Sequence, residues 1–137
     1  MKTIWCYVSL VLVFLTAGIC AAEVPNLLGN WTGSWSAYET GWGYSESTGN
    51  DSINIAVVEQ KDRIFIGNLV LKAKNESDYK DSFVGAIGLD NKTLYMAEVD
   101  EGYIQGTLIS NDEMDMIYLA DGKEASVVID RVHRIKA

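Results

Sequence analysis

The chain has 137 residues, with 19 acidic and 11 basic side chains and a formal net charge of −8, which is the length of one domain. A polypeptide this acidic repels phosphate backbones, so nucleic acid is excluded as an expected partner. Both cysteines, Cys6 and Cys20, lie near the N-terminus, so we expect no disulfide, thiol nucleophile or cysteine metal site in the domain that follows.

Residues 1–22 have the three parts of a secretory signal peptide: the basic start Met1-Lys2, an uncharged apolar run up to Cys20, and a small-residue exit. We expect cleavage after Ala22, which leaves one domain, residues 23–137, with 10 basic and 19 acidic side chains and a net charge of −9, because one lysine is removed. An uncleaved transmembrane anchor is one alternative, although no positive stop follows the run. A lipoprotein attached through Cys20 is another, although a bulky residue precedes this cysteine. We therefore expect a secreted or cell-surface protein.

Beyond Pro25 the chain consists of short apolar stretches separated by tight-turn compositions such as Asp121-Gly122-Lys123. Two connections are long, Glu39 to Asp51 and Lys74 to Asp81. Eight strands joined mostly by hairpins predict an all-β fold, an eight-stranded antiparallel up-and-down meander barrel after an N-terminal signal helix. A flat sandwich is the alternative. The predicted strands are Asn30–Tyr38, Ser52–Gln60, Arg63–Ala73, Ser82–Leu89, Thr93–Val99, Tyr103–Ile109, Glu113–Ala120 and Ala125–Ile135.

The first strand alternates apolar and polar residues, with Trp31 and Trp35 on one face. Its polar face argues against a membrane-embedded barrel, whose outer face needs an apolar band about 25 Å tall. Three glycines follow an aromatic residue by two positions in a strand: Gly33, Gly67 and Gly85. A missing side chain lets a coiled sheet bend and leaves space for a ring, which favours a barrel.

The run Gly29-Asn30-Trp31 resembles the Gly-x-Trp signature of the lipocalin and avidin (calycin-type) barrels. In those families the tryptophan closes one end of the barrel, and a basic side chain of the last strand packs across its indole. The last strand here carries Arg131 and Arg134. Antiparallel pairing of the last strand with the first places Arg134 nearest the tryptophan, in a cation–π contact. The biotin site of the avidins is not matched, since Gly33 and Ala37 stand where that family has asparagine and serine.

Aromatic residues gather in the first strand and the glycine-rich loop after it. Trp35, Tyr38, Trp42 and Tyr44 are the candidate ligand-binding residues, because aromatic side chains on a loop at a barrel mouth suit an apolar or sugar ligand. The alternative is a loop that folds back and plugs the barrel.

Catalytic residues, metal ligands and cofactors are not predicted. His133 is the single histidine, and no nucleophile-elbow motif is present. The acidic turns lack the alternating oxygen ligands of a calcium loop. Four asparagines stand in glycosylation acceptor patterns, Asn30, Asn50, Asn75 and Asn91.

The prediction is an exported, non-catalytic binding module for a small apolar ligand or a surface partner. The first alternative is a secreted protein-binding or inhibitor-type barrel with a filled interior. An enzyme is the third, and it would need two or more polar groups converging inside a cavity. A membrane is expected as a partner only if the leader is retained. Apolar residues on both faces of Arg63–Ala73 and Ala125–Ile135 are compatible with a homo-oligomer.

Overall fold

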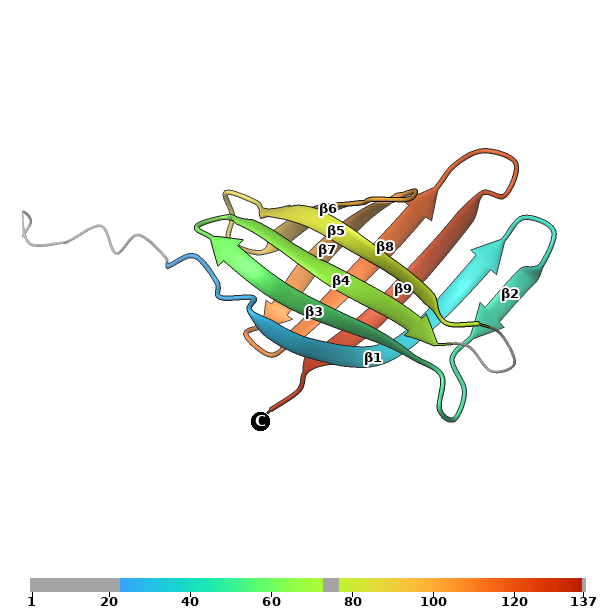
Figure 1. Ribbon diagram of the computed structural model, residues 1–137, viewed down its shortest axis with the longest axis horizontal. Coiled ribbons are helices and arrows are strands. Elements are labelled where there is room, and N and C mark those ends of the chain that lie inside the picture. The colour runs from blue at the N-terminus through green and yellow to red at the C-terminus, as the bar shows by residue number, and fades with distance from the viewer. Residues whose placement is uncertain (1–22, 73–76, 137) are drawn as a thin grey trace, which may run out of the picture.

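The computed structural model describes residues 23–72 and 77–136. The predicted signal helix and cleavage point therefore lie outside the described residues, as does Asn75. The described residues form nine strands and no helix, so they hold no helical segment long and apolar enough to cross a bilayer. The strands are β1 (Gly29–Glu39), β2 (Gly43–Glu46), β3 (Ser52–Lys61), β4 (Ile64–Lys72), β5 (Tyr79–Ile87), β6 (Thr93–Glu98), β7 (Tyr103–Ser110), β8 (Glu113–Ala120) and β9 (Ser126–Arg134) (Figure 1).

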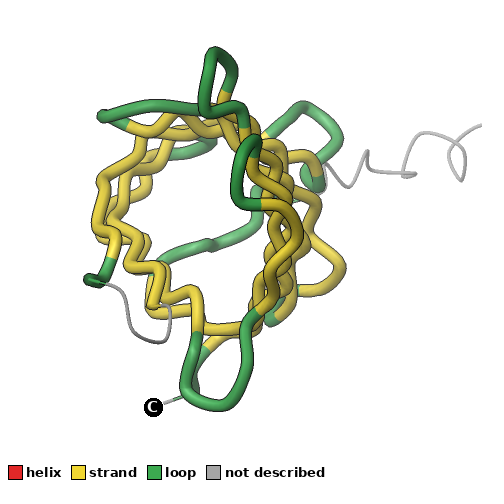
Figure 2. Tube along the Cα trace, turned by 90° about the vertical axis from the view of Figure 1, so that its right-hand side faces the viewer, coloured by secondary structure: helices red, strands yellow, loops and turns green. Residues whose placement is uncertain are grey.

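Eight of these strands, β1 and β3 to β9, close into a barrel in which each strand is antiparallel to its neighbours. Closure is made by β1 and β9, which pair from Trp31 opposite Arg134 to Glu39 opposite Ser126. Figure 2 looks along the lumen and shows the strands forming a ring. The predicted eight-stranded up-and-down barrel is confirmed, and the flat sandwich is wrong because the first and last strands are hydrogen bonded.

The connection from Glu39 to Asp51 is not the simple loop that the sequence predicts. β3 pairs with β1 only from Gly29 to Gly33, and the later part of β1 pairs with the short strand β2 instead. At Gly33 a Cβ would lie 1.8 Å from the carbonyl oxygen of Arg131, so only glycine allows the backbones to approach this closely. Beyond this point β1 leaves β3, and its free edge is taken up by the β1–β2 hairpin.

The half of the barrel that holds Trp31 is filled by side chains. The rings of Phe65 and Phe83 meet edge to face, with centroids 6.2 Å apart. Each ring lies over the glycine that faces it on the neighbouring strand, Phe83 over Gly67 and Phe65 over Gly85. The sequence predicts that these glycines leave space for an aromatic ring, and the ring that uses the space comes from the paired strand.

The N-terminal segment 23–28 crosses this filled end of the barrel. Leu27 is buried, its amide donates to the Gln60 side chain at 2.7 Å, and its carbonyl accepts the indole N–H of Trp31 at 3.0 Å. Gln60 also donates to the carbonyl of Pro25 at 2.8 Å. In Figure 2 a loop segment crosses the far side of the lumen.

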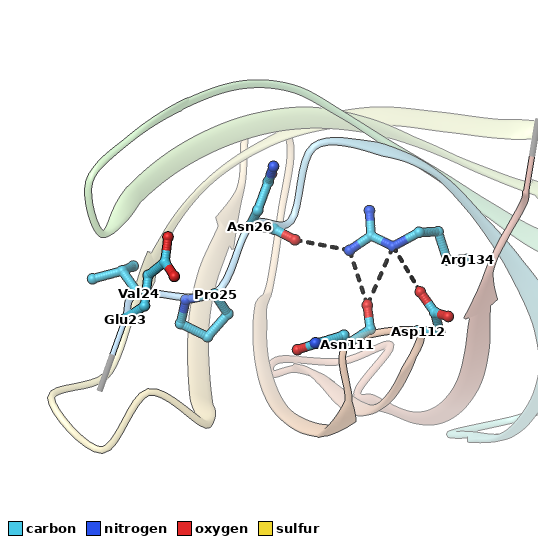
Figure 3. Close-up of a pocket in the computed structure, with 7 residues that line it drawn as sticks. All are labelled: Glu23, Val24, Pro25, Asn26, Asn111, Asp112 and Arg134. Atoms are coloured by element: carbon cyan, nitrogen blue, oxygen red, sulfur yellow. Dashed lines mark hydrogen bonds and ion pairs between the residues drawn. The ribbon is translucent and has the colours of Figure 1, made fainter. Parts of the chain in front are cut away.

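Arg134 fastens this segment to the barrel. Its guanidinium carbon lies 4.1 Å from the centroid of the Trp31 ring, the arrangement expected from the position of Arg134 in the last strand. The guanidinium donates to the backbone carbonyl of Leu28 at 2.6 Å. It also donates to the carbonyls of Asn26 and Asn111, at 2.8 to 3.2 Å, and lies 3.3 Å from a carboxylate oxygen of Asp112 (Figure 3). These contacts seal one end of the barrel, which we call the closed end.

Candidate ligand-binding cavity at the open end

The opposite end of the barrel, the open end, contains a cavity of about 260 Å³. All eight barrel strands contribute to its lining. An apolar cavity of about 150 Å³ is enough to hold benzene, and ligand pockets start at roughly 300 Å³. The cavity therefore has room for a small molecule, on the scale of one ring with a short side chain.

Most of the lining is apolar. Period-two alternation turns the same face of each strand inward, so Ile53, Ile55, Leu69, Ile104 and Met116 meet from four strands and are buried. These branched and flexible side chains leave the lumen partly empty here, whereas tryptophan and phenylalanine fill the closed end. The inner part of the cavity is therefore a dry surface suited to a hydrocarbon or aromatic group.

Asp130 is the polar residue of this inner region. It is 4% exposed, and its Oδ1 atom is buried without a hydrogen-bond partner among the described residues. Burial raises the pKa of this carboxyl from 3.8 to about 7. The sequence analysis missed this residue, although the alternation Val128, Asp130, Val132 in the last strand carried the signal, since it places a carboxyl on the inward face.

A second carboxyl, Glu98, lies toward the mouth. Burial is the main reason that its pKa rises to about 7. The hydrogen bond from Tyr79 opposes this rise, and the negative charges of Asp81 and Asp130 add to it. The Tyr79 hydroxyl lies 3.2 Å from a carboxylate oxygen of Glu98 and 3.2 Å from one of Asp81. Sequence reasoning missed Tyr79 because polar residues at the start of β5 resemble a loop, whereas they pair with β4.

Tyr118 completes the polar mouth of the cavity. Its hydroxyl donates to the carbonyl of Glu101 at 3.2 Å, and burial together with nearby acidic groups, Glu98 first, raises its pKa to about 12. The ionisable lining residues are thus three acids, with Glu39 as the third, and two phenols. Among the described residues that line this cavity, none is basic, so any charge that this lining carries is negative.

The residues that the sequence selected for ligand binding lie elsewhere. Trp35 is buried in β1, with its indole nitrogen unpaired among the described residues, but it does not line the cavity. Tyr38 and Tyr44 face each other across the β1–β2 pairing and are exposed, and the Tyr44 hydroxyl donates to Glu46 at 2.8 Å. Trp42 is 87% exposed. The hairpin stands beside the open end (Figure 1), so the alternative that Trp42 plugs the barrel is wrong.

The other candidate residues that the structure describes lie outside the cavity. Asn30 and Asn50 are exposed, while Asn91 is half-buried and donates from Nδ2 to the carbonyl of Glu23 at 3.3 Å. His133 is exposed on β9. Within residues 23–72 and 77–136 no group of three His, Cys, Asp or Glu side chains is arranged to hold a metal ion.

No model of a known protein family matches the chain, and no curated protein sequence matches it. Six chains of solved structure do match. One is described as the structure of a redesigned β-barrel, with 10% sequence identity and a TM-score of 0.57 over 80% of this chain and 92% of that chain. At such low identity the similarity concerns the fold alone. The protein is therefore an all-β, closed antiparallel β-barrel, with a cavity at the end opposite Trp31 and Arg134.

Proposed function

We propose that the protein is an exported, non-catalytic binding module that holds a small, largely apolar ligand in the open end of its barrel. The observation that carries this proposal is the cavity of about 260 Å³, lined mainly by buried aliphatic side chains. The contacts of residues 23–28 and Arg134 close the opposite end of the barrel, as suits a pocket that holds a ligand rather than conducts it. The Gly-x-Trp run, with Arg134 over Trp31, supports grouping the barrel with the calycin-type barrels.

The same cavity weighs against a barrel whose interior is filled and whose loops alone recognise a protein. The half that contains Phe65 and Phe83 is filled by buried aromatic side chains. In the other half aliphatic side chains and carboxyls surround empty space. A scaffold for loops gains no stability from such space, since an unfilled cavity costs packing energy. The cavity is therefore better explained by a ligand.

An enzyme is the second candidate, and one specific observation favours it. Glu98 and Asp130 share one cavity, and the pKa of each is raised to about 7. Two such carboxyls can divide into an acid and a base near neutral pH, which is the arrangement for proton transfer to a bound substrate. Binding and catalysis predict different fates for the bound molecule: unchanged in the first case, converted in the second.

The test is native mass spectrometry of protein purified from its own host, followed by release of the bound compound and its re-addition. A single small molecule recovered unchanged after prolonged incubation supports the binding module. Conversion of that molecule with turnover, lost in Glu98→Gln or Asp130→Asn, would establish the enzyme instead.

A pair of adjacent substitutions locates the binding site. Val128 lines the cavity, whereas Val127 points outward from the same strand. We expect Val128→Trp to fill the cavity and abolish binding, and Val127→Trp to leave binding intact. Equal binding by both folded variants would refute the cavity as the site.

A further inference from the structure

We propose that the ligand of this cavity is a small organic cation, an amine with an apolar body, whose ammonium group binds between Asp130 and Glu98. This inference rests on the proposed binding function and specifies its ligand class. It is carried by the geometry of the acidic groups within the cavity and by the sign of its charge.

The first observation is the unpaired carboxylate oxygen of Asp130. It is buried in the lining, 4% of the residue is exposed, and none of the described residues donates to it. Buried carboxylates in folded proteins are nearly always matched by a cation or by hydrogen-bond donors. A ligand that carries such donors into the cavity would supply the partner that the described residues do not provide.

The second observation is the set of polar groups that line the same cavity as Asp130. Glu98 comes from β6, Tyr79 from β5, Tyr118 from β8 and Glu39 from β1, while Ser126 shares the strand of Asp130. Asp81 of β5 adds a further negative charge beside Glu98. All these groups are acids or hydroxyls. An ammonium group has three donors and no acceptor, and this set of acceptors suits it.

Charge selects against the other common classes of small ligand. A fatty acid or another carboxylate would bring a like charge into the poorly solvated space beside Asp130 and Glu98, which is strongly unfavourable. A hydrocarbon would leave Asp130 unpaired. A cation with one apolar end satisfies both parts of the cavity, because the aliphatic floor formed by Ile55, Ile104 and Met116 receives the apolar end.

Protonation of the two carboxyls links binding to pH. With pKa values of about 7, Asp130 and Glu98 are both partly protonated at neutral pH in the free protein. An ammonium group favours the ionised carboxylate, so binding releases a proton. We expect amine affinity to rise as pH increases from 5 to 8, while the amine itself stays protonated because aliphatic ammonium groups lose their proton only near pH 10.

The experiment compares three amines, phenethylamine, tryptamine and hexylamine, each with the alcohol and the carboxylate of the same skeleton. Binding to the protein, expressed from the full-length chain, is measured by isothermal titration calorimetry in two buffers of different ionisation enthalpy. We expect at least one amine to bind at least about tenfold more tightly than its alcohol, as for hydrogen bonds to charged groups. We also expect proton release at pH 7 and no binding of the carboxylates.

Variants test the proposal of an amine ligand separately from the proposal that the cavity binds a ligand. Asp130→Asn should weaken amine binding at least about tenfold and leave alcohol binding unchanged. Asp121→Asn removes the same charge from an exposed turn at the open end and should leave both unchanged. If alcohols or carboxylates bind as tightly as the amines and Val128→Trp abolishes that binding, the cation proposal is wrong and the binding module stands. If no compound of any charge occupies the cavity, both proposals fail.

Discussion

Trp35 and Asp130 lie directly opposite each other in the β1–β9 pairing, and each holds a buried polar atom without a partner among the described residues, the indole Nε1 and the carboxylate Oδ1. Each unsatisfied group costs roughly 1–3 kcal/mol. At the closed end, by contrast, the indole N–H of Trp31 is hydrogen bonded and its ring is covered by Arg134. The contacts that stabilise the barrel around Trp31 and the candidate binding site thus lie at opposite ends of the barrel.

The stability of the barrel should decrease as pH rises from about 4 to about 7. The pKa of Asp130 is 3.8 in the unfolded chain and about 7 in the folded one, so in this window the folded state holds a proton that the unfolded state has lost. The difference corresponds to at most about 4 kcal/mol, fully present below pH 4 and lost above pH 7. Urea unfolding at pH 4, 5, 6, 7 and 8 measures it.

Asp130→Asn should remove much of that pH dependence and stabilise the protein by about 1 kcal/mol or more at pH 8, because no charge is then buried. At pH 4 the variant and the parent should be similar. Asp121→Asn, in an exposed turn, is the control. Identical pH profiles for the parent and Asp130→Asn would show that this carboxyl is not the titrating group.

Arg134→Lys should destabilise the barrel by roughly 1–3 kcal/mol, although the charge is retained. Lysine cannot reproduce the planar guanidinium fork that contacts the carbonyls of Asn26, Leu28 and Asn111 and covers Trp31. Arg131→Lys is the matched control in the same strand. Arg131 is exposed, and its ion pair with Asp115 is long at 4.0 Å. The free energy of unfolding of Arg131→Lys should therefore stay within about 0.5 kcal/mol of the parent value. Chemical denaturation compares them, and equal losses would contradict a sealing role for Arg134.

Gly85→Ala should cost about 1–3 kcal/mol by overpacking. A Cβ at this position would lie 2.5 Å from the Phe65 ring, which is buried and packs edge to face against Phe83. Gly106→Ala is the control, because its nearest contact is 3.2 Å, to the Leu94 side chain. Thermal melting of the two variants shows which one loses more stability. A larger loss in Gly106→Ala than in Gly85→Ala would contradict this account of the core.

Trp42→Ala should change the free energy of unfolding by no more than about 0.5 kcal/mol, because the indole is 87% exposed. If the β1–β2 hairpin covers a ligand at the open end, the same substitution should accelerate ligand dissociation. Stopped-flow release of the bound compound measures this rate. An unchanged rate in a variant of unchanged stability would remove the hairpin from the site.

The sequence by itself determined the barrel and the placement of Arg134 beside Trp31. Alternation with a period of two sets which face of a strand points inward, and hairpin turns set the order of the strands. Both are local properties, read over a few residues. Given closure between the first and last strands, the position of Arg134 opposite Trp31 follows from antiparallel pairing alone.

Only the tertiary structure decided where the barrel is empty and which polar groups meet there. A cavity is the volume left after inward side chains from all strands have been placed, so no single strand contains the information. Asp130, Glu98 and Tyr79 come from β9, β6 and β5, and the raised pKa values of the two acids depend on burial by other strands. The small strand β2 likewise pairs with the part of β1 that β3 does not cover, and the point where β1 and β3 separate is set by the packing of the whole barrel.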